Sequence, residues 1–274
     1  MSINRQFQRT TRYIRTHWPV YTGLYGSLVL AVLFIGLSLA LEWYSFITFS
    51  LAIVLVASYL LIAYLYLAYL LNDAPGGTAA DILIDLGQAK PIDRVVCLDL
   101  GLRTTPVAVA KYMTTGEVMA IDLYNPQSNT GASLHRARAR ARKPVADPRL
   151  QWIDGNIELL PLPDRSVSAV YMNRILSEFW LPEEREQLLK EVFRILIPEG
   201  RLLLAEPIRA QSHLLLTGLI TYGLPTPEHW RETLMKAGFT LRKEKTARGL
   251  LFCVRADKPS PTAGKQMQLN LEFI

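Results

Sequence analysis

Cysteine and histidine are scarce, because the 274-residue chain has two cysteines and four histidines. Cys97 and Cys253 both lie within apolar runs, which is typical of reduced, buried residues of an intracellular domain and excludes a disulfide framework. No pair of cysteines or histidines has the spacing of a metal-binding motif, so we expect no structural metal.

Charge is absent from two long segments near the N-terminus, residues 20–41 and residues 46–71. Each is as long as the roughly 20 residues that cross about 30 Å of hydrocarbon as a helix, and only four residues separate them. The sequence therefore predicts a transmembrane helical hairpin over residues 20–71. Its small residues could let the helices pack closely, namely Gly23, Gly26, Ser27, Gly36 and Ser38. A cleaved signal peptide is disfavoured because the first run is too long and a second follows at once. With no ionisable residue in either run, we expect the hairpin to be an anchor.

Positive charge precedes this hairpin. The arm formed by residues 1–19 carries four arginines, Arg5, Arg9, Arg12 and Arg15. The loop between the two runs carries only Glu42, so the positive-inside rule places the N-terminus in the cytoplasm, and two spans return the rest of the chain to the same side. We therefore expect a two-span membrane protein whose partner is the lipid bilayer, with anionic head groups attracting the arm.

The rest of the chain alternates between predicted strands and helices. Residues 72–93 form a turn-rich linker and a lead-in helix, residues 94–256 form a domain, and residues 257–274 form a tail. The expected strands are residues 95–100, 118–123, 150–153, 168–172, 200–206, 240–246 and 250–255. Because helical segments separate most of them, the pattern predicts an α/β domain with a mostly parallel seven-stranded sheet, helices on both faces and a final antiparallel pair.

Five features of this domain have the order and content of a known family. The first is VVCLDLG at residues 95–101, a strand that ends in an acid and a glycine turn, and Asp122 ends the next strand. The others are GNIELLPLPD at residues 155–164, residues 188–204 and residues 226–239. In these features residues 94–256 resemble the class I S-adenosylmethionine (SAM)-dependent methyltransferases, and most of all the ubiquinone and menaquinone biosynthesis methyltransferase-like (methyltransferase type 11) group.

The resemblance implies a Rossmann-like fold and a methyltransferase with SAM as its cofactor. Glycines in the first turn let the backbone approach the ligand, and the carboxylate of Asp122 is expected to accept hydrogen bonds from both ribose hydroxyls. Asn156 stands where the family has an acid that faces the adenine. The residues expected to bind the cofactor are Asp99, Gly101, Asp122, Asn156, Ile157 and Asn173.

The first turn departs from the family pattern. Of the usual Gly-x-Gly-x-Gly only Gly101 remains, with Arg103 and Thr105 at the other two places. Two hypotheses therefore stay open, an active enzyme and a non-catalytic methyltransferase-fold membrane protein that binds a ligand or scaffolds a complex.

An active enzyme whose acceptor must lose a proton also needs a base. The candidates are Asn173, Arg174 and Glu178, which follow the fourth strand, and Glu206, which ends the fifth. Arg174 and Glu178, four residues apart, also fit a plain surface pair.

Residues 212–224 are nearly all apolar and stand where the family inserts a segment that covers the substrate. They suit a hydrophobic acceptor pocket, a segment that dips into the bilayer surface, or an ordinary cover helix with its apolar side on the core. Together with the anchor, this segment favours a lipophilic small-molecule acceptor such as a quinol, an isoprenoid or another lipid.

Two further segments carry weaker patterns. Residues 133–142 form a predicted basic helix, expected to be a solvated surface with lipid head groups as the functional alternative. Because no aromatic residues interleave with its charges, we expect no nucleic-acid partner. In the tail, residues 268–273 (QLNLEF) resemble the peptide that docks bacterial proteins on the DNA polymerase sliding clamp, although an edge strand or a disordered end is the favoured interpretation.

Overall fold

The computed structural model describes residues 7–90, 93–113, 116–141 and 147–260. The chain divides into two compact units, one formed by Met1–Gly76 with Gln211–Tyr222 and the other by Gly77–Ala210 with Gly223–Ile274. The sliding-clamp-like peptide lies outside the described residues, as do Arg142 and Lys143 of the basic cluster.

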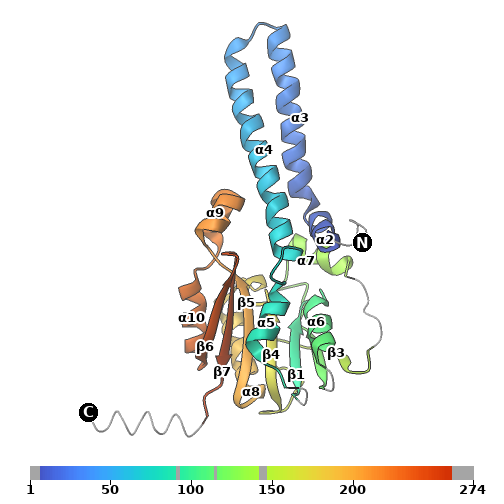
Figure 1. Ribbon diagram of the computed structural model, residues 1–274, viewed down its shortest axis with the longest axis vertical. Helices are drawn as coiled ribbons and strands as arrows, with labels where there is room; N and C mark the ends of the chain where they lie inside the picture. Colours follow the sequence, from blue (N-terminus) through green and yellow to red (C-terminus); the bar gives the residue numbers. More distant parts are fainter. Residues whose placement is uncertain (1–6, 91–92, 114–115, 142–146, 261–274) are drawn as a thin grey trace, which may run out of the picture. The chain divides into compact units, whose positions relative to one another are not determined.

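The first unit is helical (Figure 1). Its elements are α2 (Gln8–Thr16), α3 (Trp18–Ala40), α4 (Tyr44–Asn72), α9 (Gln211–Thr217) and the short 3₁₀ helix η2 (Gly218–Gly223). The two long apolar helices expected from the sequence are present. Only 11% of the most apolar stretch of α3 and 17% of that of α4 is buried, so neither is the core helix of a globular domain.

The two long helices pack against each other through small side chains. The small residues buried in α3 and α4 are Ala31, Ser38, Ser50, Ala57, Ala63 and Ala68. The hydroxyl of Tyr21 donates a hydrogen bond of 3.2 Å to the carbonyl of Tyr64, which aligns the start of α3 with the second half of α4. The expected role of the glycines is not observed, because a Cβ added at Gly23 or Gly26 would meet no atom within 4 Å.

The second unit is built on one seven-stranded sheet of order β3-β2-β1-β4-β5-β7-β6. The strands are β1 (Val95–Asp99), β2 (Val118–Asp122), β3 (Leu150–Asp154), β4 (Val167–Asn173), β5 (Leu196–Pro207), β6 (Thr240–Ala247) and β7 (Leu251–Asp257). Strands β1 to β5 pair in parallel, and β7 runs antiparallel to both β5 and β6. The expected mostly parallel sheet with a final antiparallel pair is confirmed.

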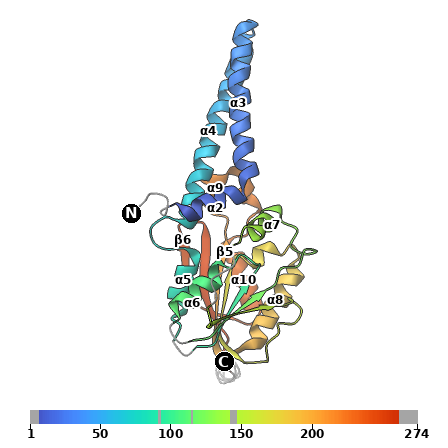
Figure 2. The same cartoon turned by 90° about the vertical axis from the view of Figure 1, so that its right-hand side faces the viewer.

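Helices cover both faces of this sheet. They are α5 (Ala79–Gly87), α6 (Thr104–Tyr112), α7 (Ala132–Ala139), α8 (Pro182–Ile195), α10 (Pro227–Lys236) and the 3₁₀ helix η1 (Leu176–Glu178). Helices α5 and α6 lie on one face, and α8 and α10 lie on the other (Figure 2). The strands of the centre, such as β1, are buried along their whole length, which explains their continuous apolar sequence.

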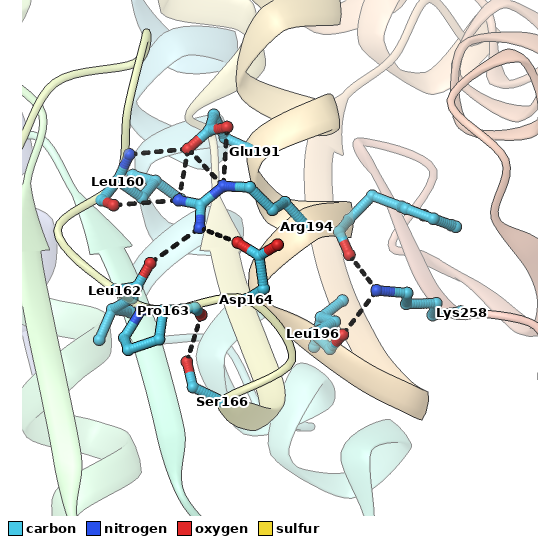
Figure 3. Close-up of polar contacts among 10 residues, drawn as sticks. Leu160, Leu162, Pro163, Asp164, Ser166, Glu191, Arg194, Leu196 and Lys258 are labelled. Atoms are coloured by element: carbon cyan, nitrogen blue, oxygen red, sulfur yellow. Dashed lines mark hydrogen bonds and ion pairs between the residues drawn. The ribbon is translucent and has the colours of Figure 1, made fainter.

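A cluster of hydrogen bonds centred on Arg194, called the Arg194 cluster below, holds the long loop between β3 and β4. This loop, residues 155–164, has no helix or strand of its own. Figure 3 shows Arg194 of α8 reaching this loop. Its Nη1 donates to the carbonyl of Leu162 at 2.9 Å and to Asp164 Oδ1 at 2.7 Å, and its Nη2 donates to the carbonyl of Leu160 at 3.1 Å. Glu191, one turn earlier, bonds the Arg194 guanidinium and accepts from the N–H of Leu160 at 2.9 Å. The two family-like stretches at 155–164 and 188–204 are therefore parts of one tertiary contact.

Candidate cofactor site

A row of polar side chains lies at the carboxyl ends of four adjacent strands. In the register of the sheet, Asp99 of β1 stands beside Asp122 of β2, and Asp122 stands beside Asp154 of β3. Asn173 ends β4 on the other side of β1. Ligands of open α/β sheets bind at this edge, so the structure brings three of the expected cofactor-binding residues together. Asp154 was not predicted at this edge. Its position directly after the third predicted strand, residues 150–153, could have indicated it.

The turn after β1 has the backbone shape that a glycine-rich loop needs. Gly101 has φ 79° and Arg103 has φ 65°, both in the left-handed region. The N–H of Arg103 donates to Asp99 Oδ2 at 2.7 Å, and α6 begins at the next residue. Arg103 therefore takes, at a cost in backbone strain, the conformation that glycine adopts freely.

The side chain of Arg103 is directed toward β3. Its guanidinium carbon lies 5.8 Å from the ring centroid of Trp152, within the range of a cation–π contact. The Arg103 side chain thus has a partner two strands away in the sheet order, on β3.

The carboxylate of Asp99 is almost completely buried, with 4% of the residue exposed. Burial raises its pKa to about 6, the charge of Asp122 adds to this rise, and the hydrogen bond from the N–H of Arg103 opposes it. Asp99 accepts a hydrogen bond from the loop backbone. Because its pKa is raised, it also carries a proton more readily than an exposed aspartate does.

Arg138 of α7 occupies the space between the glycine turn and Asp122. Its Nη1 donates to both carboxylate oxygens of Asp122, at 2.8 Å and 2.5 Å, and its guanidinium carbon lies 4.3 Å from the ring centroid of Tyr124. A Cβ added to Gly101 would come within 1.9 Å of Arg138 Nη1, so the guanidinium rests directly on this glycine. Arg138 is a component of the site.

Sequence reasoning missed this residue by assigning the whole basic segment to a solvated surface. The readable signal was its spacing, because Arg138 lies four residues after Leu134 and so on the same side of α7. Leu134 is buried in the core, which turns this side of the helix toward the sheet.

Asn173 and Thr105 pair beside the row of acids. The Asn173 Nδ2 donates to Thr105 Oγ1 at 3.0 Å, so the threonine at the third glycine place has a partner. The Asn173 Oδ1 is buried and has no hydrogen-bond partner among the described residues. An acceptor of this kind suits an N–H or O–H donor of a bound ligand, because an unpaired buried polar atom is costly.

Glu206, one of the candidate bases, is fully buried. Its carboxylate accepts hydrogen bonds from three consecutive backbone N–H groups, those of Ile175 at 2.9 Å, Leu176 at 2.8 Å and Ser177 at 3.2 Å. Burial raises its pKa to about 7, and these hydrogen bonds oppose the rise. This geometry makes Glu206 a residue that positions the loop after β4.

That loop carries the other candidates. The N–H of Arg174 donates to the carbonyl of Ala205 at 2.7 Å, with φ 54° at Arg174. Glu178 lies on η1, where burial raises the pKa of its carboxyl and the charge of Arg174 opposes the rise. A Cβ added to Gly131 would lie 3.5 Å from Glu178 Oε2, so this carboxylate stands beside the residue that precedes α7.

Asn156 and Ile157 lie in the loop that Arg194 holds. The N–H of Gly155 donates to the carbonyl of Asp122 at 2.9 Å, which places the start of this loop beside the end of β2. The Asn156 Oδ1 accepts from the N–H of Glu158 at 3.1 Å, and Ile157 packs against the core.

Within the described part of the chain, no group of three histidine, cysteine, aspartate or glutamate side chains is arranged to hold a metal ion.

Comparison with known proteins identifies the domain. Residues 98–204 match the family described as methyltransferase domain. The chain carries a methyltransferase domain. A solved SAM-dependent methyltransferase from Aquifex aeolicus superposes on it with a TM-score of 0.50 and 18% identity, covering 66% of this chain and 89% of that one, which shows the shared fold.

Curated relatives are of the same kind. A malonyl-(acyl-carrier protein) O-methyltransferase of Alcanivorax borkumensis is 31% identical over 163 residues, 56% of this chain and 51% of that one. A probable S-adenosylmethionine-dependent methyltransferase of Mycolicibacterium smegmatis is 38% identical over 73 residues, 27% of this chain and 26% of that one. The chain thus spans about half, or less, of the length of these relatives. The expectation of a methyltransferase domain of the SAM-dependent kind is confirmed.

Proposed function

We propose that this protein is a membrane-anchored SAM-dependent methyltransferase that acts on a lipophilic small molecule at the cytoplasmic face of a membrane. The observation that carries the proposal is the row of Asp99, Asp122 and Asn173 beside the left-handed turn at Gly101, within a methyltransferase domain. The rest of the proposal draws on the apolar helices and on the chemistry of methyl transfer.

The residues of this row fit the cofactor. Asp122 offers two carboxylate oxygens to the ribose hydroxyls of SAM once Arg138 releases them, and the unpaired Asn173 Oδ1 suits a donor such as an amino group. Gly101 has no side chain, so the backbone of the turn would be accessible to the ligand once the Arg138 guanidinium, which rests on this glycine, moves away. Asn156 and Ile157 remain candidates for the adenine side.

SAM supplies a methyl group bound to a positively charged sulfur, so the protein has mainly to position the acceptor in line with it. An acceptor that loses a proton needs a base, and Glu178 fits best, because its burial raises its pKa and so strengthens it as a proton acceptor. Arg174 on the same loop, and Asn173 at the end of β4, would orient the acceptor.

Membrane anchoring rests on the exposed apolar surface of α3 and α4. The mean hydropathy of their most apolar 18-residue stretches is 2.1 and 2.5, and side chains such as Leu30, Leu55 and Ile62 are more than 60% exposed. Such a surface is unstable in water and suits hydrocarbon. The arginine-rich arm before α3 supports a cytoplasmic N-terminus, and the anchor supports an acceptor that dissolves in the bilayer.

Calorimetric titration of SAM into the detergent-solubilised full-length protein tests the cofactor site. We expect binding that Asp122→Asn weakens at least about tenfold, because it removes one of the charged oxygens that ribose hydroxyls bond. Asp147→Asn is the matched control, since Asp147 also pairs with an arginine, Arg149, but lies before β3. Folded protein that does not bind SAM would overturn the enzyme proposal.

The acceptor is tested by incubating the protein in vesicles with SAM that carries a radioactive methyl group, together with quinols, isoprenoids or lipids. Transfer of label into the organic phase, lost in Asp122→Asn, is the expected result. Label that enters only water-soluble acceptors would contradict the lipophilic class while leaving the enzyme intact.

A non-catalytic role is the second candidate, and the pair of Arg138 with Asp122 favours it. This pair neutralises the carboxylate that ribose hydroxyls would need. A protein that stays folded, does not bind SAM as wild type and does not bind it after Arg138→Ala would fit this second role.

A further inference from the structure

The segment between β5 and α10 leaves the sheet domain and returns to it. Residues Gln211–Tyr222 belong to the compact unit of the hairpin, while the residues on either side belong to the sheet domain. The two ends of this excursion are tied together, because the N–H of Arg209 donates to the carbonyl of Pro225 at 2.8 Å. The chain thus leaves the sheet domain and returns to it at neighbouring points.

Within the hairpin unit, this segment lies against α4. Helix α9 contacts α4, and the hydroxyl of Tyr59 donates a hydrogen bond to the carbonyl of Leu215. Leu215 is in the last turn of α9, where backbone carbonyls have no partner within the helix. Tyr59 therefore satisfies a group that would otherwise require water.

Two threonines in the second half of the segment have their hydroxyls satisfied within it. The hydroxyl of Thr217 donates to the carbonyl of His213 at 3.0 Å, and the hydroxyls of Thr217 and Thr221 bond each other. The segment contains no aspartate, glutamate, lysine or arginine. These two threonine hydroxyls are thus paired in the way that an environment without water demands.

Four of its large hydrophobic side chains, in contrast, are exposed. Leu215 is 66% exposed, Leu219 81%, Ile220 72% and Tyr222 59%. An ordinary cover helix buries its apolar side on the core, so this segment does not have the pattern expected of one.

The level of α9 along the hairpin follows from the contacts of α3 with α4. Tyr21 stands beside Tyr64, so Trp18, three residues before Tyr21, stands at about the level of Leu67. At about 1.5 Å per residue, Tyr59 lies about 12 Å from this level toward the hairpin loop. Tryptophan prefers the interface between membrane and water, and with Trp18 at that interface Tyr59 would lie inside the hydrocarbon and not at its surface.

We infer that α9 and η2 are embedded in the bilayer beside α4, with Leu215, Leu219 and Ile220 in contact with the acyl chains of lipids. This inference rests on the proposed membrane span of α4. The segment would then be a third membrane contact beside α3 and α4. The sequence left open an acceptor pocket, a segment in the bilayer or a cover helix, and this inference selects the segment in the bilayer.

The experiment uses full-length protein in lipid vesicles with an environment-sensitive fluorophore on one introduced cysteine. Native Cys97 and Cys253 are fully buried, so the unsubstituted protein gives the labelling background. Leu219→Cys reports on the segment, and Leu55→Cys, 64% exposed on α4, reports on the span. Glu186→Cys, on the exposed side of α8, reports on water. Quenching is measured with lipids that carry a nitroxide on the acyl chain and, separately, with iodide in the water.

We expect the labels at 219 and 55 to lose most of their fluorescence to the acyl-chain nitroxide and to resist iodide, with the opposite result at 186. If the label at 55 behaves in this way but the label at 219 is quenched only by iodide, α4 spans the membrane and the inference about the segment is wrong. If both respond only to iodide, the span itself fails and the inference falls with it. A label at 219 that is buried in lipid while 55 is in water would contradict the placement beside α4.

Discussion

Arg138 donates two hydrogen bonds from one nitrogen to the two carboxylate oxygens of Asp122, at 2.8 Å and 2.5 Å. The pair joins α7 to the carboxyl end of β2 and presses the guanidinium against Gly101. The carboxylate expected to bind ribose thus already has a cation as its partner. For Asp122 to bind the ribose of SAM as proposed, Arg138 would have to leave this position.

Removing this arginine should strengthen SAM binding. Arg138→Ala frees both oxygens of Asp122. Because the ion pair is partly exposed, we expect the Kd for SAM to fall several-fold, by at most about tenfold. Calorimetric titration of the full-length protein measures it. Arg140→Ala, an exposed arginine of the same basic segment, is the control and should leave Kd unchanged. An unchanged or weaker affinity in Arg138→Ala would show that Arg138 does not compete with the cofactor.

The left-handed conformation at Arg103 predicts which residues this position accepts. At φ 65°, Arg103→Gly relieves strain and should leave the free energy of unfolding within about 1 kcal/mol of wild type, since the lost contact with Trp152 offsets the gain. Arg103→Val, a β-branched residue that resists positive φ, should lower it by about 1–2 kcal/mol. Chemical denaturation in detergent measures both, and equal stabilities would argue against the left-handed turn.

The Arg194 cluster should be a major source of stability for the loop between β3 and β4. Arg194→Met leaves the buried Glu191 without its cation and the carbonyls of Leu160 and Leu162 without this donor, so we expect a loss of about 2–4 kcal/mol. Arg231→Met is the control, because Arg231 also bridges two carboxylates, Glu228 and Glu244, but at the surface, where the cost should stay below about 1 kcal/mol. The same denaturation experiment tests both, and similar losses would contradict the role of the cluster.

Glu206 should make the stability of the protein depend on pH. Its pKa in the folded state is raised from 4.5 to about 7, so the folded protein holds a proton that the unfolded chain releases. The free energy of unfolding should therefore fall as pH rises from about 4.5 to 7 and level off above, by about 3 kcal/mol in total.

Glu206→Gln removes this titration while keeping the shape of the side chain. Asp99, with a pKa of about 6, also lowers the free energy of unfolding as pH rises, but mainly below pH 6. The difference in stability between variant and wild type is therefore compared from pH 6 to 8. Wild type should lose stability relative to Glu206→Gln across this window, as measured by thermal unfolding. A constant difference between the two proteins would show that Glu206 is charged throughout.

The sequence alone was sufficient for the elements and for part of the site. The uncharged runs of α3 and α4, the apolar strands and the helix starts are local patterns, because periodicity and capping depend on residues close together in the chain. Asp99 and Asp122 were predictable for the same reason, since each ends a buried strand and parallel strands bring their carboxyl ends to one edge. The capping of α5 by Asp81 and Thr78 is equally local.

Tertiary structure decided the rest. The partner of Asp122 is Arg138 on a helix that looked like a solvated surface, and Glu206 binds the backbone about thirty residues before it. Segment Gln211–Tyr222 looked like a part of the sheet domain and groups with the hairpin. Such contacts join residues whose distance in space is set by the packing of helices on the sheet and of α9 on α4. No spacing along the chain encodes them, so only the folded arrangement determines which charge meets which carboxylate and which apolar segment faces outward.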